Sequence, residues 1–176
     1  MGGLNMTLIP LHGKHGRGLN VIVDDDVAEE LSKYRWHCNS KGYAWRSVYC
    51  GRQDGKQKNR CIYLHREVLR FAGIEIPDGY EADHINQDKR DARISNLRVV
   101  THRQNLANSK PRGGTSRYKG VCWDKYAGKW KAQIWHNGKL TYLGLFTNQE
   151  DAGLAYDVAA RPLQGEYAYC NFPENP

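Results

Sequence analysis

Short apolar and polar stretches alternate in the first part of the chain and predict a small, mostly antiparallel sheet. Turn residues separate the β-type runs LNVIV, YRWHC, GYAWRSVYC and CIYL, and the polar segment GRQDGKQKN lies between the last two. Two helices are predicted among these runs, at residues 27–34 and 63–73, and the second ends at Gly73. We therefore expect an α+β fold in this part of the chain.

The next segment has the pattern of a strand, a loop, a second strand and a helix. A turn at residues 77–79 leads into a short strand, and NLRVV at residues 96–100 is the second one. Thr101 and Gln104 have the spacing of a capping box, in which both side chains bond open backbone amides. We therefore expect a helix that begins at Thr101 and carries Asn105 in its first turns.

Composition changes at residues 107–117, ANSKPRGGTSR, where proline, glycine, serine and basic residues without apolar periodicity predict a linker. Beyond it, YKGVCWD, KWKAQIWH and KLTYLGLF are strand patterns separated by turn signals, and the Asn-Gly of HNGK is a strong hairpin signal. Thr147 and Glu150 form a second capping box, which opens a helix that fades near Pro162. Three strands and one helix make a small β3-α module.

The apolar positions of this module predict its core and, by alternation, its outward face. The expected core consists of Val121, Trp130, Ala132, Ile134, Leu143, Phe146, Ala155, Val158 and Ala159. The expected outward positions are Lys131, Gln133, Trp135 and Tyr142. Aromatic rings among lysines are costly on a free surface and suit contact with bases and sugars, although a protein interface is the alternative.

The charge of the chain indicates a polyanionic partner. Its 26 Lys and Arg against 19 Asp and Glu give a net charge of +7, which favours nucleic acid, although charge alone also fits a basic soluble protein. No apolar run approaches the ~20 residues of a membrane span, and MGGLNMTLIP lacks the apolar core of a secretory signal. Five widely spaced cysteines without a C-x-x-C pair predict reduced thiols. We therefore expect a cytoplasmic protein that binds no membrane.

The polar residues between Asp83 and Asn105 suggest a hydrolytic centre. Asp83 and His84 are adjacent, and a turn or bulge beside them brings both side chains to one rim of the sheet. A carboxylate and the amide oxygen of Asn105 are hard ligands that suit Mg2+ or Mn2+. A neighbouring imidazole can accept the proton of an attacking water. Such an assembly hydrolyses phosphodiesters, although an acid–histidine pair beside a turn is most often a surface hydrogen-bonded pair.

The stretches YLHREVL, IPDGYEADHIN and SNLRVVTHRQN resemble the HNH nucleases, and among them the phage and intron-associated homing endonucleases with a ββα-metal fold. The resemblance covers residues 61–108. It implies that Asp83 and Asn105 are metal ligands. It also implies that His84 is the general base and that Asn96 holds His84 in orientation. A divalent metal such as Mg2+ or Mn2+, products with a 3'-hydroxyl and a 5'-phosphate, and nicking of one strand are implied as well.

Some positions depart from the pattern of that family. Ala92 stands where relatives often have Asn, and the first metal ligand is an Asp where many relatives have His. The cysteine pairs that hold a structural zinc in some relatives are absent, so we expect no structural zinc. Arg93 and Arg98 are placed to approach the scissile phosphate, and solvated or ion-paired arginines are the alternative. His102 is expected on the surface, with phosphate contact as its other role, and His65 is expected as a packed helix histidine.

The segment at residues 116–173 resembles the APETALA/ethylene-response-factor DNA-binding domain through YKGV, GKW, YLG, EDA, AYD and NFP. The resemblance implies a three-stranded sheet in the major groove of DNA. Arginines that read guanine in plant relatives are replaced, because Cys122, Asp124 and Trp135 occupy outward positions, so the target of those relatives is not carried over. The DNA contacts expected from linker and module are Lys110, Arg112, Arg117, Lys125, Tyr126, Lys129, Lys131, Gln133, Trp135, Lys139 and Tyr142.

These inferences combine into a two-domain, site-directed DNA endonuclease. We expect an HNH endonuclease domain at residues 1–108, a basic flexible linker at residues 109–116 and a DNA-binding domain at residues 117–176. The enzyme is expected to act as a monomer on double-stranded DNA in a bacterial or phage-infected cell, like mobile phage and intron-borne enzymes. The alternative is a catalytically inactive DNA-binding regulator. An RNA-processing nuclease fits less well, because the module resembles a reader of duplex DNA.

Overall fold

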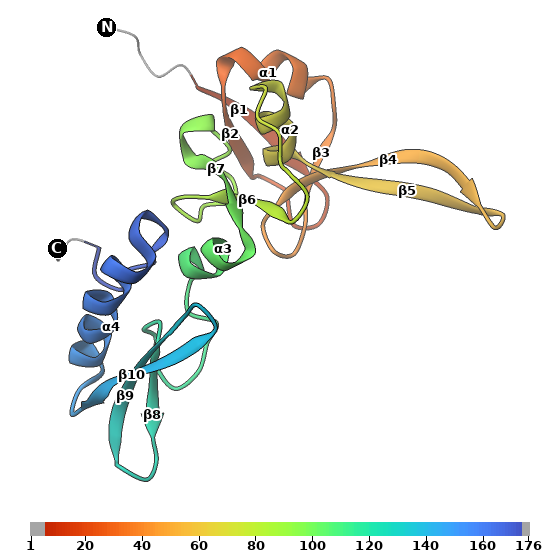
Figure 1. Ribbon diagram of the computed structural model, residues 1–176. Coiled ribbons are helices and arrows are strands. Elements are labelled where there is room, and N and C mark those ends of the chain that lie inside the picture. Colours follow the sequence, from red (N-terminus) through yellow and green to blue (C-terminus); the bar gives the residue numbers. More distant parts are fainter. Residues whose placement is uncertain (1–5, 174–176) are drawn as a thin grey trace, which may run out of the picture. The chain divides into compact units, whose positions relative to one another are not determined.

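The computed structural model describes residues 6–173, in two compact units of which one ends at Thr101 and the other begins at His102 (Figure 1). The elements of the first unit are β1 (Met6–His12), β2 (Asn20–Asp24), α1 (Asp25–Ser32), β3 (Trp36–Cys38), β4 (Ala44–Gln53), β5 (Lys56–Tyr63), α2 (Leu64–Phe71), β6 (Tyr80–His84), the 3-10 turn η1 (Ile94–Asn96) and β7 (Leu97–Thr101). Those of the second unit are α3 (His102–Asn108), β8 (Val121–Asp124), β9 (Lys129–His136), β10 (Lys139–Phe146), α4 (Gln149–Gln164) and η2 (Gly165–Tyr167). The α+β class is confirmed.

The main sheet of the first unit has the strand order β2-β1-β3-β4-β5. All its pairings are antiparallel except that of β1 with β3. The hydrophobic pattern misses β1, because Pro10 lies inside this strand and proline is rare in a strand that has a neighbour on each side. Apolar side chains of the sheet and of α1 and α2 form one core, which includes Ile9, Leu11, Val21, Val23, Leu31, Trp36, Leu64, Val68 and Leu69.

Strands β6 and β7 form a separate antiparallel pair in the same unit, in which Asp83 faces Arg98 and His84 faces Leu97. The loop that joins them is fastened to β2 through Ile22, whose N–H donates to the Arg90 carbonyl at 2.7 Å and whose carbonyl accepts from the Ala92 N–H at 2.9 Å. These bonds hold the end of β6 and the start of β7 against the main core.

In the second unit, β10, β9 and β8 form an antiparallel sheet on which α4 packs. The predicted strands and helix are confirmed, and Val121, Ala132 and Ile134 are buried as predicted. The prediction of Val158 in the core is wrong, because its side chain is 72% exposed. The helix instead turns Ala152, Tyr156 and Ala160 inward, which are four residues apart and therefore share one face.

The ends of α4 differ by a few residues from those predicted. The N-cap is Asn148 rather than Thr147, since the Asn148 Oδ1 accepts from the Asp151 N–H at 2.7 Å. The helix continues through Pro162 to Gln164, because a proline in the last turn removes only one of the closing hydrogen bonds. No helix among the described residues is long and apolar enough to cross a membrane. The five cysteines are free thiols.

Candidate active site

Asp83 and His84 end strand β6 and are both buried, with exposed fractions of 7% and 4%. Asp83 pairs with the partly buried Arg98 on the facing strand, whose Nε donates to Asp83 Oδ2 at 3.0 Å. The guanidinium offsets the cost of burying the carboxylate and fixes its orientation. Of the alternatives for Arg98, the structure therefore shows an ion-paired arginine beside the predicted metal ligand.

The ring of His84 packs against two other rings of the first unit. Its centroid lies 4.9 Å from that of His65 on α2 and 6.1 Å from that of Tyr43. Burial lowers the pKa of His84 below its ordinary value, and the nearby carboxylates of Asp83, Asp88 and Asp91 act in the opposite direction. A histidine with a lowered pKa is neutral at neutral pH, which is the form that accepts a proton.

Asn96 lies in the turn before β7 and makes several hydrogen bonds to the loop that follows His84. Its Oδ1 accepts from the Asn86 N–H at 2.9 Å, and its Nδ2 donates to Asn86 Oδ1 at 2.9 Å and to the Asp91 carbonyl at 2.7 Å. The Ile85 N–H donates to the Asn96 carbonyl at 2.9 Å. Asn96 thus bonds to the backbone beside His84, as the predicted orienting role requires.

Asp91 holds the other side of this loop. Arg93 donates from Nε to Asp91 Oδ1 and from Nη2 to Asp91 Oδ2, each at 2.7 Å. Asn86 Nδ2 also donates to Asp91 Oδ2, at 2.9 Å. The hydrogen bonds from Arg93 lower the pKa of Asp91. Ala92, where relatives often have Asn, is 1% exposed and lies in the core of the unit. The loop is therefore braced by Asp91 and Asn96, and residue 92 contributes apolar packing.

Asn105 and His102 lie on α3, in the second unit. The two units are not placed relative to one another, so Asp83, His84 and Asn96 form one described cluster to which Asn105 is not assigned. Within its own unit, α3 is held at its last turn by Lys119, whose Nζ donates to the carbonyls of Leu106 and Ala107 at 3.0 and 2.5 Å. Burial lowers the pKa of Lys119 to about 8.

The Asp83 carboxylate suits a hard divalent cation, because it is an oxygen ligand of the type that Mg2+ prefers when water and phosphate complete its shell. Among the described residues, no three His, Cys, Asp or Glu side chains form a group that could hold a metal ion.

The outward face of the second unit carries the predicted DNA contacts. Trp135 on β9 is 63% exposed and Tyr142 on β10 is 59% exposed, and Tyr142 pairs in register with Gln133. Lys131 lies 3.7 Å from Asp124 across β8 and β9, so this lysine is partly neutralised. Arg117 pairs with Glu150 at 3.2 Å on the surface. The sheet thus exposes aromatic rings, while Lys131 and Arg117 are paired with carboxylates.

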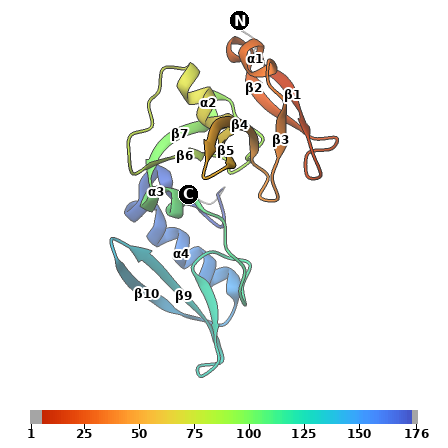
Figure 2. The ribbon, with the colours of Figure 1, turned by 90° about the vertical axis from the view of Figure 1, so that its right-hand side faces the viewer.

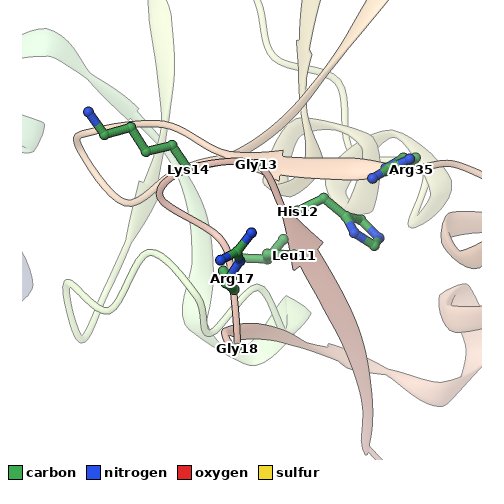
Figure 3. Close-up of a pocket in the computed structure, with 7 residues that line it drawn as sticks. All are labelled: Leu11, His12, Gly13, Lys14, Arg17, Gly18 and Arg35. Atoms are coloured by element: carbon green, nitrogen blue, oxygen red, sulfur yellow. The ribbon is translucent and has the colours of Figure 1, made fainter.

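Sequence reasoning missed a cationic cleft of about 730 Å3 in the first unit. Figure 3 shows Lys14 and Arg17 on the loop between β1 and β2, with His12 and Arg35 on the other side of the cleft. Within the described residues, Lys14, Arg17 and Arg35 make no ion pair with a carboxylate. The basic residues are visible in the sequence, but the approach of Arg35 to the end of β1 depends on the parallel pairing of β1 with β3.

We predict that His65 makes the first unit sensitive to acid. Burial, with smaller repulsion from His84 and Arg66, lowers the pKa of His65 from 6.5 to about 3. Below pH ~6.5 the His65 imidazole is protonated in the unfolded chain but stays neutral in the folded one. The free energy of unfolding therefore falls as the pH decreases. The free energy of unfolding, measured with urea, should fall between pH 7 and pH 4.5 by about 2–3 kcal/mol more in the wild type than in His65→Phe.

A matched control for this prediction is His15→Phe, which replaces an exposed histidine of the same unit. The control should follow the wild-type pH dependence. Equal pH dependence in wild type and His65→Phe would contradict the assignment of the acid sensitivity to His65.

We predict that Asn96→Ala destabilises the first unit by about 2–3 kcal/mol, because it leaves the Asn86 N–H and the Asp91 carbonyl without their buried partner. The measurement is urea unfolding at neutral pH. The control is Asn20→Ala on β2, an exposed position expected to change stability by less than about 0.5 kcal/mol. A loss no larger than that of the control would show that the Asn96 bonds are not a brace.

Comparisons with known proteins find relatives that match one or both units of the chain. Residues 63–107 match the family described as HNH endonuclease. The Uncharacterized HNH endonuclease L560 of Acanthamoeba polyphaga mimivirus is 30% identical over 156 residues, which cover 89% of this chain and 76% of the viral protein. The AP2-like ethylene-responsive transcription factor ANT of Arabidopsis thaliana is 28% identical over 158 residues, which cover 81% of this chain. APETALA2-like protein 2 of Oryza sativa subsp. indica is 42% identical over 62 residues, or 35% of this chain.

The extent of these matches differs between the two kinds of relative. The chain spans 28% of the length of ANT and 36% of that of the Ethylene-responsive transcription factor WRI1 of Arabidopsis thaliana, but 76% of the viral protein. The family match includes β6, β7 and most of α3, and with them Asp83, His84, Asn96 and Asn105. The chain therefore belongs to the HNH endonuclease family, and it combines the HNH unit with an AP2-like one.

Proposed function

We propose that this chain is a site-directed DNA endonuclease that requires a divalent cation. The observation that carries the proposal is the Asp83–His84 pair at the end of β6, buried beside Arg98 and next to a loop braced by Asn96. This cluster joins a carboxylate, a neutral imidazole and a fixed loop within an HNH family match. Its oxygen donors and its proton acceptor are the groups that phosphodiester hydrolysis needs.

In the proposed reaction, His84 accepts a proton from water while the water oxygen bonds to phosphorus. The bond from phosphorus to the 3' oxygen breaks, and that oxygen leaves as a hydroxyl after it takes up a proton from solvent. Arg98 holds the Asp83 carboxylate, and Asn96 holds the backbone that follows His84. A divalent cation bound by Asp83 and Asn105 would supply charge neutralisation at the phosphate and at the leaving oxygen. The products are a 3'-hydroxyl and a 5'-phosphate.

We further propose that the second unit anchors the enzyme on duplex DNA. Support comes from the exposed Trp135 and Tyr142 on its sheet and from the AP2-like relatives, two of which are named as transcription factors. Residues 117–176 would bind DNA and residues 1–108 would cut it as a monomer. Residues 109–116 would connect them, with Lys110 and Arg112 near phosphates. Tethering raises the concentration of the nuclease beside its target, so each part can bind weakly alone.

The experiment that tests this function examines the ends of a nick. Supercoiled plasmid that carries DNA flanking the gene is incubated with the chain and Mg2+, and the nicked product is treated with DNA ligase. We expect ligase to seal the nick without prior kinase treatment, because the ends carry a 3'-hydroxyl and a 5'-phosphate. A nick that ligase seals only after kinase and phosphatase treatment would contradict the proposed bond cleavage. Intact plasmid with a persistent gel shift would instead indicate a DNA-binding regulator.

A further inference from the structure

The hairpin of β4 and β5 extends beyond the sheet that carries it. Within the hairpin, β3 pairs only with Ala44 and Trp45 of β4, so the rest of the hairpin has no third strand. Figure 1 shows this ribbon leaving the other strands of its unit, and Figure 2 looks along it. Every residue from Lys56 to Cys61 is exposed, and Tyr49 is 59% exposed. Two strands alone are at best marginally stable in water, so a ribbon exposed on both faces indicates a binding element.

The outer part of this ribbon is strongly cationic. Between Tyr49 and Cys61 it carries one acidic residue, Asp54, against the four basic residues Arg52, Lys56, Lys58 and Arg60. In the part of the chain that the structure describes, none of these four makes an ion pair with a carboxylate. Arg46, nearer the core on the same hairpin, pairs with Glu67 at 3.4 Å. The charge of the outer ribbon is therefore available to an external anion.

The two faces of the ribbon differ in chemistry. Alternation along β5 places Lys56, Lys58 and Arg60 on one face, with successive cations ~7 Å apart. The opposite face carries Gln57 and Asn59, whose cross-strand partners in the register are Arg52 and Tyr49. Asn, Gln and Arg side chains make bidentate hydrogen bonds to the edges of adenine and guanine. One face thus suits phosphates and the other suits base edges.

We propose that the β4–β5 hairpin inserts into the major groove of duplex DNA. That groove is ~12 Å wide and admits a two-stranded ribbon. Lys56, Lys58 and Arg60 bind backbone phosphates, and the Gln57 and Asn59 face contacts base edges. The irregularity in register between Tyr49 and Arg52 adds twist to the ribbon, which helps it follow the groove. The inference rests on the proposed function for its partner and gives the first unit a DNA contact of its own.

The charge of the ribbon decides between DNA and a second copy of the chain. An exposed two-stranded ribbon can also pair with another one through its edges. Two copies would, however, bring their unpaired cations together, and like charges at close range oppose association. DNA provides the complementary charge along the whole length of the ribbon. The geometry and the charge therefore favour duplex DNA as the occupant.

The test compares two charge-matched variants of the full chain. One replaces Lys56, Lys58 and Arg60 by Gln; the other replaces Lys14, Arg17 and Arg35 of the cationic cleft by Gln. Binding to a fluorescent duplex from the DNA that flanks the gene is measured in EDTA over a series of salt concentrations. We expect the hairpin variant to lower the slope of log affinity against log salt by about 2–3 and the cleft variant to keep the wild-type slope.

The possible outcomes separate this inference from the proposed function. Wild-type chain that binds no duplex would contradict the proposed function. Wild-type binding that the hairpin variant matches, or an equal loss in both variants, would overturn the inference alone. A dimer in sedimentation that becomes a monomer only in the hairpin variant would also overturn it. A second variant, Gln57→Ala with Asn59→Ala, should keep the salt slope and reduce the preference for the flanking DNA over an unrelated duplex.

Discussion

His84→Ala is expected to lower the rate of DNA cleavage by about 100- to 10,000-fold while DNA binding persists. The imidazole is buried at the end of β6, neutral because burial lowers its pKa, and adjacent to the proposed metal ligand Asp83. Removal of the proton acceptor leaves the positioning of the phosphate intact, so the rate falls and the affinity does not. The measurement is single-turnover nicking of plasmid, with gel shift of the same duplex in EDTA.

Two controls separate the loss of a base from the loss of the fold. His15→Ala removes an exposed histidine of the same unit and should nick at the wild-type rate. Added imidazole should restore part of the activity of His84→Ala, because the small base can enter the space left by the ring. A His84→Ala variant that retains more than a tenth of the wild-type rate and has an unchanged thermal unfolding profile would contradict the role of His84 as base.

Gly120→Ala is expected to destabilise the second unit by about 2–4 kcal/mol. The variant should therefore lose DNA binding at temperatures at which the wild type is still folded and still binds. Gly120 has a φ of +74°, and a Cβ there would lie 2.0 Å from the Tyr156 ring and 2.6 Å from the Gln133 carbonyl oxygen. The ring belongs to the buried core of α4, and the Gly120 carbonyl accepts from the Gln133 N–H at 2.8 Å. The Gln133 carbonyl cannot move without distorting β9, and the Tyr156 ring cannot move without disturbing the packing of α4 on the sheet.

The matched control is Gly128→Ala, at a φ of +60° with no atom within 4 Å of the added carbon. This variant isolates the backbone cost, which should be about 1–2 kcal/mol. Thermal unfolding of both variants, with a gel shift at each temperature, makes the comparison. Equal losses of stability in the two variants would show that contact with Tyr156 does not limit this position.

Features that depend on neighbours in the chain are predicted well from the sequence. The strand expected at residues 96–100, found as β7 at Leu97–Thr101, and the β3-α order of the second unit follow from local alternation and turn residues. The N-cap of α4 is misplaced by one residue because Thr147 and Asn148 are adjacent side chains that both suit an N-cap. The exposure of Val158 is missed because packing, and not helix propensity, decides which face of α4 lies against the sheet.

Features that depend on tertiary contacts are not visible in the sequence. The contact of His65 with His84 joins α2 to β6, and the pairing of Arg98 with Asp83 requires the register of β6 and β7. The strand that contains Pro10 gains its stability from β2 and β3 on its two sides, which overrides the local preference against proline. The role of Asp91 as a brace in place of residue 92 likewise appears only when the loop is folded.

The most direct measurement of the central claim is nicking of supercoiled plasmid by the wild-type chain as Mg2+ is titrated, with EDTA as the reference. The account predicts intact plasmid in EDTA, nicked product that rises to a plateau with Mg2+, and loss of that product when EDTA is added back. Nicking at the same rate in EDTA, or intact plasmid at every Mg2+ and Mn2+ concentration while the gel shift persists, would contradict it.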